Sequence, residues 1–198
     1  MLDGAAAAAG LMVLALPLAV IALLVRLNMG APVLFVQRRP GYHGRPFRLV
    51  KFRTMTGERG PDGDLLPDGA RLTGFGRWLR ATSLDELPEL WNVLRGDMSL
   101  VGPRPLLMEY LPLYSPRQAR RHEVRPGLTG WSQVNGRNAV DWTTRLEMDV
   151  WYVDHRSLWL DLRIIARTVG LVLRREGIHQ AGQATMDAFR GNGPGPNA

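Results

Sequence analysis

Residues 4–25 read GAAAAAGLMVLALPLAVIALLV, a run of 22 residues without a charged side chain. A straight helix of this length would just cross the ~30 Å of hydrocarbon in a bilayer, at about 1.5 Å per residue. Pro17 divides the run and predicts a kink, because proline removes one helical hydrogen bond and clashes with the preceding turn. Two halves this short favour a re-entrant helix–break–helix that enters one leaflet and returns. A kinked helix that spans the bilayer remains the alternative.

The chain that follows this run is strongly basic. Residues 26–53 hold seven basic side chains and no acidic one. Short basic flanks stay on the cytoplasmic side of a membrane, so the body of the protein is predicted to face the cytoplasm. Basic groups beside a bilayer also favour anionic lipid head groups. The seven residues are Arg26, Arg38, Arg39, Arg45, Arg48, Lys51 and Arg53.

The composition excludes several classes of protein. The 198 residues contain no cysteine, which rules out disulfides, thiolate nucleophiles and cysteine-ligated metals. The formal net charge is +7, and 24 of the 25 basic residues are arginine, Lys51 being the exception. A lone lysine suggests a site that needs a compact ammonium group. Because the basic residues alternate with glycine, proline and acids instead of lining one helix, nucleic acid is not an expected partner.

Outside the apolar run, periodicity and turn residues predict an α+β fold that is mainly helical. Residues 32–36 and 47–52 are expected to form a small β-hairpin, because a Pro-Gly turn separates two apolar runs. The glycine-rich stretch 56–76 is expected to be a mobile loop. Further helices are expected at 77–81, 88–94, 106–124 and 142–152, and irregular segments at 96–105 and 125–138.

The clearest amphipathic helix is predicted over residues 157–175, SLWLDLRIIARTVGLVLRR. One apolar face carries Leu158, Leu162, Ile165, Val169 and Val172. Such a face either packs on the protein core or lies along a membrane surface, and the sequence leaves both open.

Two adjacent carboxylates stand in the segment TSLDELP, residues 82–88. Pro88 suits the first position of a helix, which would place Asp85 and Glu86 at its N-terminal end. The helix dipole favours ionised carboxylates there, and an ionised Asp can act as a nucleophile or bind a divalent metal. A purely structural role is the alternative, because Ser83 and Glu86 also fit a capping box.

Several arginines stand beside turn residues. Arg104 lies between two prolines, which restrict its backbone, and a fixed guanidinium fork binds phosphate well. Arg125, Arg137 and Lys51 lie in similar surroundings. Several bases with few nearby acids indicate a polyanionic ligand, plausibly a diphosphate.

Four long segments together resemble one family, the small monotopic polyprenyl-phosphate phosphoglycosyltransferases among the bacterial sugar transferases. The chain departs from the family pattern in having only two residues before Asp3, and Leu16-Pro17 where Ser-Pro is frequent. The segments are PVLFVQRRPGYHGRPFRLVKFRTM (32–55), LRATSLDELPELWNVLRGDMSLVGPRPLLMEYLPLYS (79–115), HEVRPGLTGWSQVNGRNAVDW (122–142) and RLEMDVWYVDHRSLWLDLRII (145–165).

The resemblance implies an enzyme on the cytoplasmic face of the bacterial inner membrane, embedded from one side among the membrane lipids. It implies transfer of a sugar-1-phosphate from a UDP-sugar to undecaprenyl phosphate, giving undecaprenyl-diphosphate-sugar and UMP, with Mg²⁺ required. It also implies a re-entrant hairpin at 1–29, interfacial amphipathic helices and a catalytic domain at 30–190, and a disordered tail is expected at 191–198. A catalytically silent scaffold that binds nucleotide sugars is the alternative.

The resemblance also assigns roles to residues of this chain. Asp85 is implied to attack the sugar-linked phosphate, to form a covalent phosphosugar intermediate in a ping-pong scheme, and to bind Mg²⁺. Glu86 is implied to assist, by proton handling or by metal contact. The residues implied to bind the phosphates and the nucleotide are Lys51, Arg80, Arg104 and Arg137. The identity of the sugar and the oligomeric state are left open.

Overall fold

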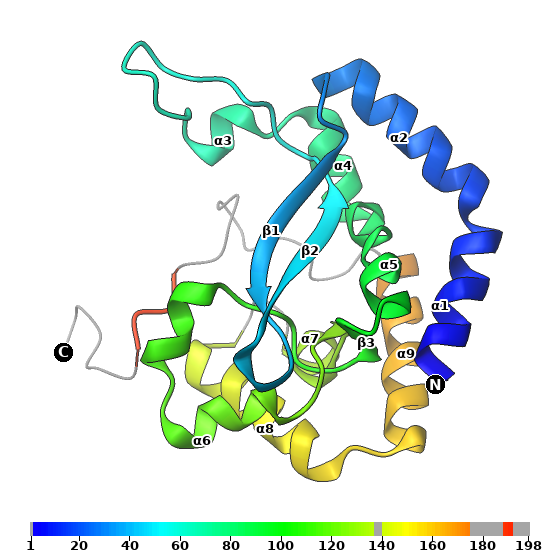
Figure 1. The fold of residues 1–198 in the computed structure, drawn as a ribbon, viewed down its shortest axis with the longest axis vertical. Coiled ribbons are helices and arrows are strands. Elements are labelled where there is room, and N and C mark those ends of the chain that lie inside the picture. The colour runs from blue at the N-terminus through cyan, green and yellow to red at the C-terminus, as the bar shows by residue number, and fades with distance from the viewer. Residues whose placement is uncertain (1, 137–139, 175–187, 192–198) are drawn as a thin grey trace.

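The computed structural model describes residues 2–136, 140–174 and 188–191, and within these ranges the fold is mainly helical with a central antiparallel hairpin (Figure 1). The expected tail at 191–198 lies outside the described residues except for Gly191. Along the chain the elements are α1 (Leu2–Val13), α2 (Ala15–Met29), β1 (Leu34–Pro40), η1 (Tyr42–Gly44), β2 (Pro46–Phe52), α3 (Asp68–Arg71), α4 (Gly74–Ala81), η2 (Leu84–Glu86), α5 (Glu89–Leu94), β3 (Ser99–Val101), η3 (Met108–Leu113), α6 (Pro116–Ala119), η4 (Arg120–Glu123), β4 (Gly127–Thr129), α7 (Trp131–Asn135), α8 (Trp142–His155) and α9 (Leu158–Arg174).

The apolar N-terminal run folds into two helices, α1 and α2, that follow one edge of the molecule (Figure 1). They are bent by 65° at Leu14, one turn before Pro17 of α2, so the predicted kink is confirmed slightly N-terminal to the proline. Ala7 of α1 packs against α5, and Ile21 and Val25 of α2 pack among Phe52 and other apolar side chains. In the part of the chain that the structure describes, no single helix is long and apolar enough to cross a membrane, whereas this bent pair meets the same criterion.

The predicted hairpin is confirmed, with longer strands than expected. Strands β1 and β2 pair antiparallel from Leu34 opposite Phe52 to Pro40 opposite Pro46. Helix α5 docks on this hairpin through Asn92. The Asn92 side chain accepts a hydrogen bond from the Val50 backbone N–H (3.1 Å) and donates one to the Arg48 carbonyl (2.7 Å). These contacts bring the start of α5 to the end of β2.

Two segments expected to be irregular instead pair with each other. Strand β3 (Ser99–Val101) and strand β4 (Gly127–Thr129) form a short parallel ladder. The backbones approach so closely that a Cβ added to Gly127 would lie 2.0 Å from the Gly102 nitrogen. Only glycine fits such an approach. The stretch 56–76 is also not wholly a loop, since it contains α3 and the start of α4, which Thr73 caps through Gly76.

The prediction of a continuous helix over 106–124 was wrong. The segment forms three short turns, η3, α6 and η4. Pro112 and Pro116 explain the difference, because proline cannot donate the hydrogen bond that a continuing helix needs. A capping box between Ser115 and Gln118 starts α6 after this interruption.

The predicted amphipathic helix is confirmed as α9, but most of the predicted apolar face does not meet the core. Ile164 is the fully buried residue of α9 and packs against Val101 and Tyr152. Leu158 and Trp159 are 63% and 76% exposed, and Leu162 and Val169 are also exposed. Helix α9 therefore has a core-facing side and a second apolar side that no described residue covers.

Candidate active site

The two adjacent carboxylates lie in a tight turn ahead of α5. Ser83 adopts a left-handed conformation (φ 56°), which a non-glycine residue adopts only at an energetic cost, and Leu84–Glu86 then form the 3-10 turn η2. The Ser83 side chain makes no capping hydrogen bond, so the alternative of a capping box is not realised. The two carboxylates were expected at the N-terminal end of a helix begun by Pro88. They do precede that helix, but within the separate turn η2, and Pro88 is the cap residue of α5 instead of its first helical residue.

Glu86 is the centre of an ion-pair cluster. Its Oε1 atom lies 3.0 Å from Nζ of Lys51, and both carboxylate oxygens accept hydrogen bonds from the Arg104 guanidinium. Burial alone would raise the pKa of Glu86, but Arg104 first and Lys51 second outweigh it and hold that pKa well below its usual range. Glu86 is therefore an ionised carboxylate whose charge is already balanced by protein cations.

Asp85 is buried without a partner of its own. It is 8% exposed, and its carboxylate makes no hydrogen bond or ion pair to any described residue. Burial first, and the neighbouring charge of Glu86 second, raise the pKa of Asp85 to about 6. The expectation that a helix dipole favours its ionised form therefore needs correction, because desolvation dominates. Above pH 6 Asp85 is still an anion, and no hydrogen bond from the described residues competes for its oxygens.

A third carboxylate, Glu89, was missed in the sequence. It is 2% exposed, and its Oε1 atom lies 3.2 Å from Nζ of Lys51, so the ammonium is shared between Glu86 and Glu89. Burial raises the pKa of Glu89 to about 7, although Lys51 opposes the shift. The available signal was its position three residues after Glu86, which on a turn or helix brings the two side chains to one side.

Arg104 is held on a well-supported loop. Arg121 donates a 2.7 Å hydrogen bond to the Arg104 carbonyl and forms a buried ion pair with Asp149 at 2.7 Å. Asp149 also accepts a 2.7 Å hydrogen bond from Ser132. The predicted rigidity of the Pro-Arg-Pro segment thus comes from tertiary contacts as well as from the prolines.

The remaining predicted residues are placed less directly. Arg80 of α4 donates a 3.0 Å hydrogen bond to Thr54, and the charge of Asp85 acts on it. Burial lowers the pKa of Arg80, and Asp85 opposes that shift. Arg137 lies outside the described residues. The structure thus gathers Lys51 and Arg104 around the dyad, with Arg80 within electrostatic range of Asp85.

The donor set fits a substrate-bound magnesium ion better than a metal held by protein alone. Across residues 2–136, 140–174 and 188–191, no three His, Cys, Asp or Glu side chains are placed to hold a metal. Mg²⁺ is commonly bound by one or two carboxylates together with substrate phosphates and water. The unpartnered carboxylate of Asp85 meets that requirement.

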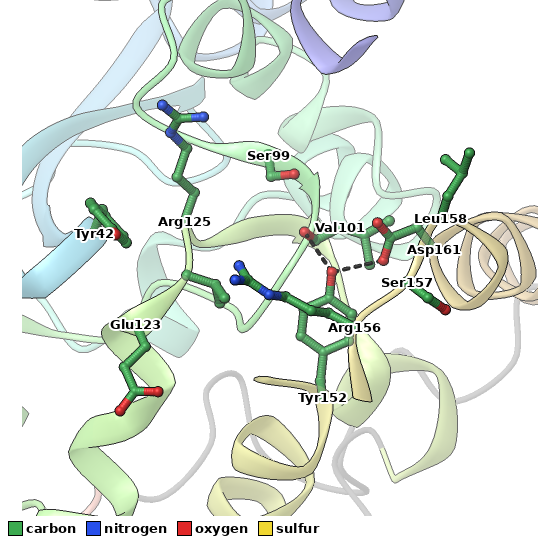
Figure 2. A pocket seen from close by; sticks show the side chains of 11 residues that line it. Tyr42, Ser99, Val101, Glu123, Arg125, Tyr152, Arg156, Ser157, Leu158 and Asp161 are labelled. Carbon is green, nitrogen blue, oxygen red and sulfur yellow. Dashed lines mark hydrogen bonds between the residues drawn. The ribbon is translucent and has the colours of Figure 1, made fainter. Parts of the chain in front are cut away.

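A cavity lies elsewhere in the described structure. It measures about 520 Å³, and Figure 2 shows Arg125, Tyr152, Arg156 and Asp161 on its walls. The Tyr152 hydroxyl donates a 2.7 Å hydrogen bond to Asp161. Arg125, which the sequence grouped with the candidate phosphate-binding bases, lines this cavity, whereas Lys51, Arg80, Asp85, Glu86 and Arg104 do not, so the cavity does not mark the site of the two adjacent carboxylates.

Comparisons with known proteins identify the family. The family described as bacterial sugar transferase matches residues 1–175. The chain is 62% identical over 169 residues to the uncharacterized sugar transferase EpsL of Bacillus subtilis, covering 85% of this chain and 84% of EpsL. It is 45% identical over 184 residues to the UDP-glucose:undecaprenyl-phosphate glucose-1-phosphate transferase of Caulobacter vibrioides, covering 87% of this chain and 69% of that protein.

The chain also matches a longer relative, but over only about a third of that relative's length. The undecaprenyl-phosphate galactose phosphotransferase of Salmonella typhimurium is 42% identical over 168 residues, which cover 76% of this chain but 35% of that protein. The family match over residues 1–175 confirms the family resemblance that the sequence motifs predicted. On this evidence the chain belongs to the bacterial sugar transferase family.

Proposed function

We propose that the protein transfers a sugar-1-phosphate from a UDP-sugar to undecaprenyl phosphate, giving undecaprenyl-diphosphate-sugar and UMP. Relatives named for UDP-glucose, UDP-galactose and undecaprenyl phosphate support this substrate class. The observation that carries the proposal is the unpartnered, buried carboxylate of Asp85 beside Lys51 and Arg104. This arrangement suits a nucleophile that must approach a diphosphate, because the neighbouring cations offset the negative charge that would repel it.

The reaction proceeds in two displacement steps at the same phosphorus. In the first, an oxygen of Asp85 attacks the sugar-linked phosphorus, and the bond to the bridging oxygen breaks, so UMP leaves with that electron pair. In the second, an oxygen of the lipid phosphate attacks the same phosphorus and the Asp85 carboxylate leaves. The phosphosugar is held on Asp85 between the steps, so the soluble donor and the lipid acceptor occupy one site in turn.

The protein groups around Asp85 have distinct roles in this scheme. Arg104 and Lys51 attract and orient the donor phosphates, because their charges lie beside Asp85 on a supported loop and a strand. Glu86 holds both cations in the absence of donor. Arg80 adds positive potential around Asp85. Asp85 would hold Mg²⁺ together with the donor phosphates, and the bound ion would neutralise phosphate charge.

We further propose a monotopic location on the cytoplasmic face of a membrane. The outward side chains of the bent pair α1–α2 are apolar and exposed, among them Met12, Val13 and Leu16. The exposed apolar side of α9 adds a second surface of the same character. A re-entrant anchor at 1–29 would hold the catalytic body at 30–190 against the bilayer, where the phosphate of a membrane-embedded acceptor is accessible.

The test is UMP release from a panel of UDP-sugars with Mg²⁺, comparing the wild type with Asp85→Asn. Without lipid acceptor, the wild type should release up to one UMP per enzyme and gain the mass of one phosphosugar by intact-protein mass spectrometry. Undecaprenyl phosphate should then remove that mass and restore turnover, and Asp85→Asn should show neither event. Donor binding without UMP release from any sugar would support the scaffold alternative instead.

A further inference from the structure

We propose that Glu89 is a positioning residue that anchors Lys51 beside the dyad while the donor diphosphate competes with Glu86 for the ammonium. The inference rests on the proposed function, because it concerns how Lys51 meets the donor phosphates. It gives a function to a buried acid that the reaction scheme itself does not use.

Lys51 has two carboxylate partners, one accessible to solvent and one buried. Its Nζ atom lies 3.0 Å from Glu86 and 3.2 Å from Glu89. The side chains of Lys51 and Glu86 are 17% and 18% exposed, whereas that of Glu89 is 3% exposed. A ligand arriving from solvent can therefore reach Lys51 and Glu86 but not Glu89. Glu89 can act on the donor only through Lys51.

The charges of the cluster require the second carboxylate. With both glutamates ionised, the charges of Lys51 and Arg104 are balanced by those of Glu86 and Glu89, so these four groups are electrically neutral as a set. Arg39 of β1 also acts on Glu89, and it is held by a hydrogen bond to the Pro105 carbonyl (3.4 Å). Without Glu89, Glu86 alone would face both cations. Lys51 would then keep only one of its two carboxylate partners, and the largely buried ammonium would become less ordered.

Donor binding makes this anchor necessary. The donor phosphates and Glu86 compete for the same two cations, because Glu86 is the carboxylate that occupies them in the ligand-free protein. When phosphate displaces Glu86 from Lys51, the contact to Glu89 keeps the ammonium near its place on β2. The site is then preorganised for phosphate, which lowers the entropic cost of binding the donor.

The first test exploits the fact that Lys51 is the sole lysine of the chain. Lysine labelled with ¹³C at Cε gives one resonance, and its titration in detergent or nanodiscs reports the Lys51 ammonium directly. Burial lowers the pKa of Lys51. The negative charges of Glu86 and Glu89 outweigh this effect, so the pKa is raised above its usual value. Glu89→Gln and the apolar Glu89→Met should each move the midpoint to lower pH. Glu147→Gln, which breaks a surface ion pair with Arg117, should leave it unchanged.

The second test separates donor binding from chemistry. Glu89→Met should raise KM for the UDP-sugar by about tenfold or more while kcat falls much less, because a buried charged contact is lost. Glu89→Gln should stay within about threefold of the wild type, because its amide oxygen can still accept from Lys51. Circular dichroism melts identify any variant that fails to fold. If Glu89→Met does not fold, the shift of the lysine titration midpoint in Glu89→Gln decides whether Glu89 anchors Lys51.

The outcomes distinguish the anchor from the proposed function. A folded Glu89→Met protein with wild-type KM and an unmoved lysine midpoint would overturn the anchor. If the wild type releases no UMP from any donor while the lysine midpoint still responds to Glu89→Gln, the proposed function fails and the contact between Glu89 and Lys51 stands.

Discussion

At the scale of single residues, Asp85 and Glu86 show how neighbours in sequence can acquire opposite chemistry. Glu86 is bound by two cations and its pKa falls, whereas Asp85 forms no ion pair within the described parts of the chain and its pKa rises to about 6. The difference arises because Lys51 and Arg104 reach one carboxylate and not the other. One acid thus organises the cations, and the other retains unoccupied oxygens for attack.

This division predicts that Asp85→Asn stabilises the protein that it inactivates. A pKa raised from 3.8 to about 6 makes the ionised form roughly 3 kcal/mol less favourable in the folded state, to an order of magnitude. The penalty is complete above pH 6 and vanishes below the unfolded pKa. The gain from Asp85→Asn should therefore appear at pH 7.5 and shrink as the pH falls towards 4.

The measurement is the unfolding midpoint of both proteins in chelator between pH 5 and 7.5. Chelator is required because a bound cation would favour the ionised carboxylate. Glu147→Gln, at an exposed ion pair, serves as the control and should change the midpoint little at any pH. Equal stability of Asp85→Asn and wild type across this range would show that the Asp85 carboxylate is not desolvated as described.

At the scale of elements, local pattern predicted the hairpin and α9, because alternation and helical periodicity are written in neighbouring residues. Local pattern failed where the structure depends on contacts between segments that are distant in sequence. The parallel pairing of β3 with β4 joins segments that are far apart in sequence, and neither strand has an apolar run of useful length. The burial of Glu89 depends in the same way on Lys51 arriving from β2. The assignment of Asp85 and Glu86 to catalysis is a prediction from motif resemblance, whereas the electrostatic difference between the two acids required the fold.

The bend between α1 and α2 predicts that both ends of this helix pair lie on the same side of the membrane. A cysteine introduced by Leu2→Cys is unique, because the chain has no other. For a re-entrant anchor this residue stays cytoplasmic, so a membrane-impermeant maleimide should not label it in intact cells. Pro17→Ala restores a helical N–H donor, and a continuous helix over 2–29 would be about 42 Å long, enough to span. Labelling from outside should therefore increase in Pro17→Ala.

Arg59→Cys, at an exposed position, provides the control and should react after the membrane is permeabilised. External labelling of Leu2→Cys with Pro17 intact would establish a spanning helix and exclude the re-entrant anchor. Unchanged labelling in Pro17→Ala would mean that the packing of Ala7 on α5, and of Ile21 beside Phe52, sets the bend without the proline.

At the scale of the whole molecule, two helical elements expose apolar side chains: the outer side of α1–α2, and the exposed side of α9 with Leu158, Trp159 and Leu162. The first anchors the protein in the proposed arrangement, and the second fixes how the body is oriented on the bilayer. Orientation matters for the lipid acceptor, whose tail stays in the membrane, and not for the soluble donor. The two half-reactions of the proposed scheme should therefore depend differently on α9.

Leu162→Glu places a charge on that exposed apolar side without touching the dyad. The variant should stay membrane-bound through α1–α2 and form the phosphosugar enzyme at a rate near that of the wild type. Its transfer to undecaprenyl phosphate in vesicles should slow by about tenfold, because a carboxylate resists burial at the interface and tilts the body away. Rapid-quench measurement of UMP release and of lipid-linked product separates the two rates. Arg163→Gln, an adjacent exposed position with the same change in net charge, should slow neither. Equal slowing of both half-reactions by Leu162→Glu would mean that α9 supports the catalytic fold and does not orient it on the membrane.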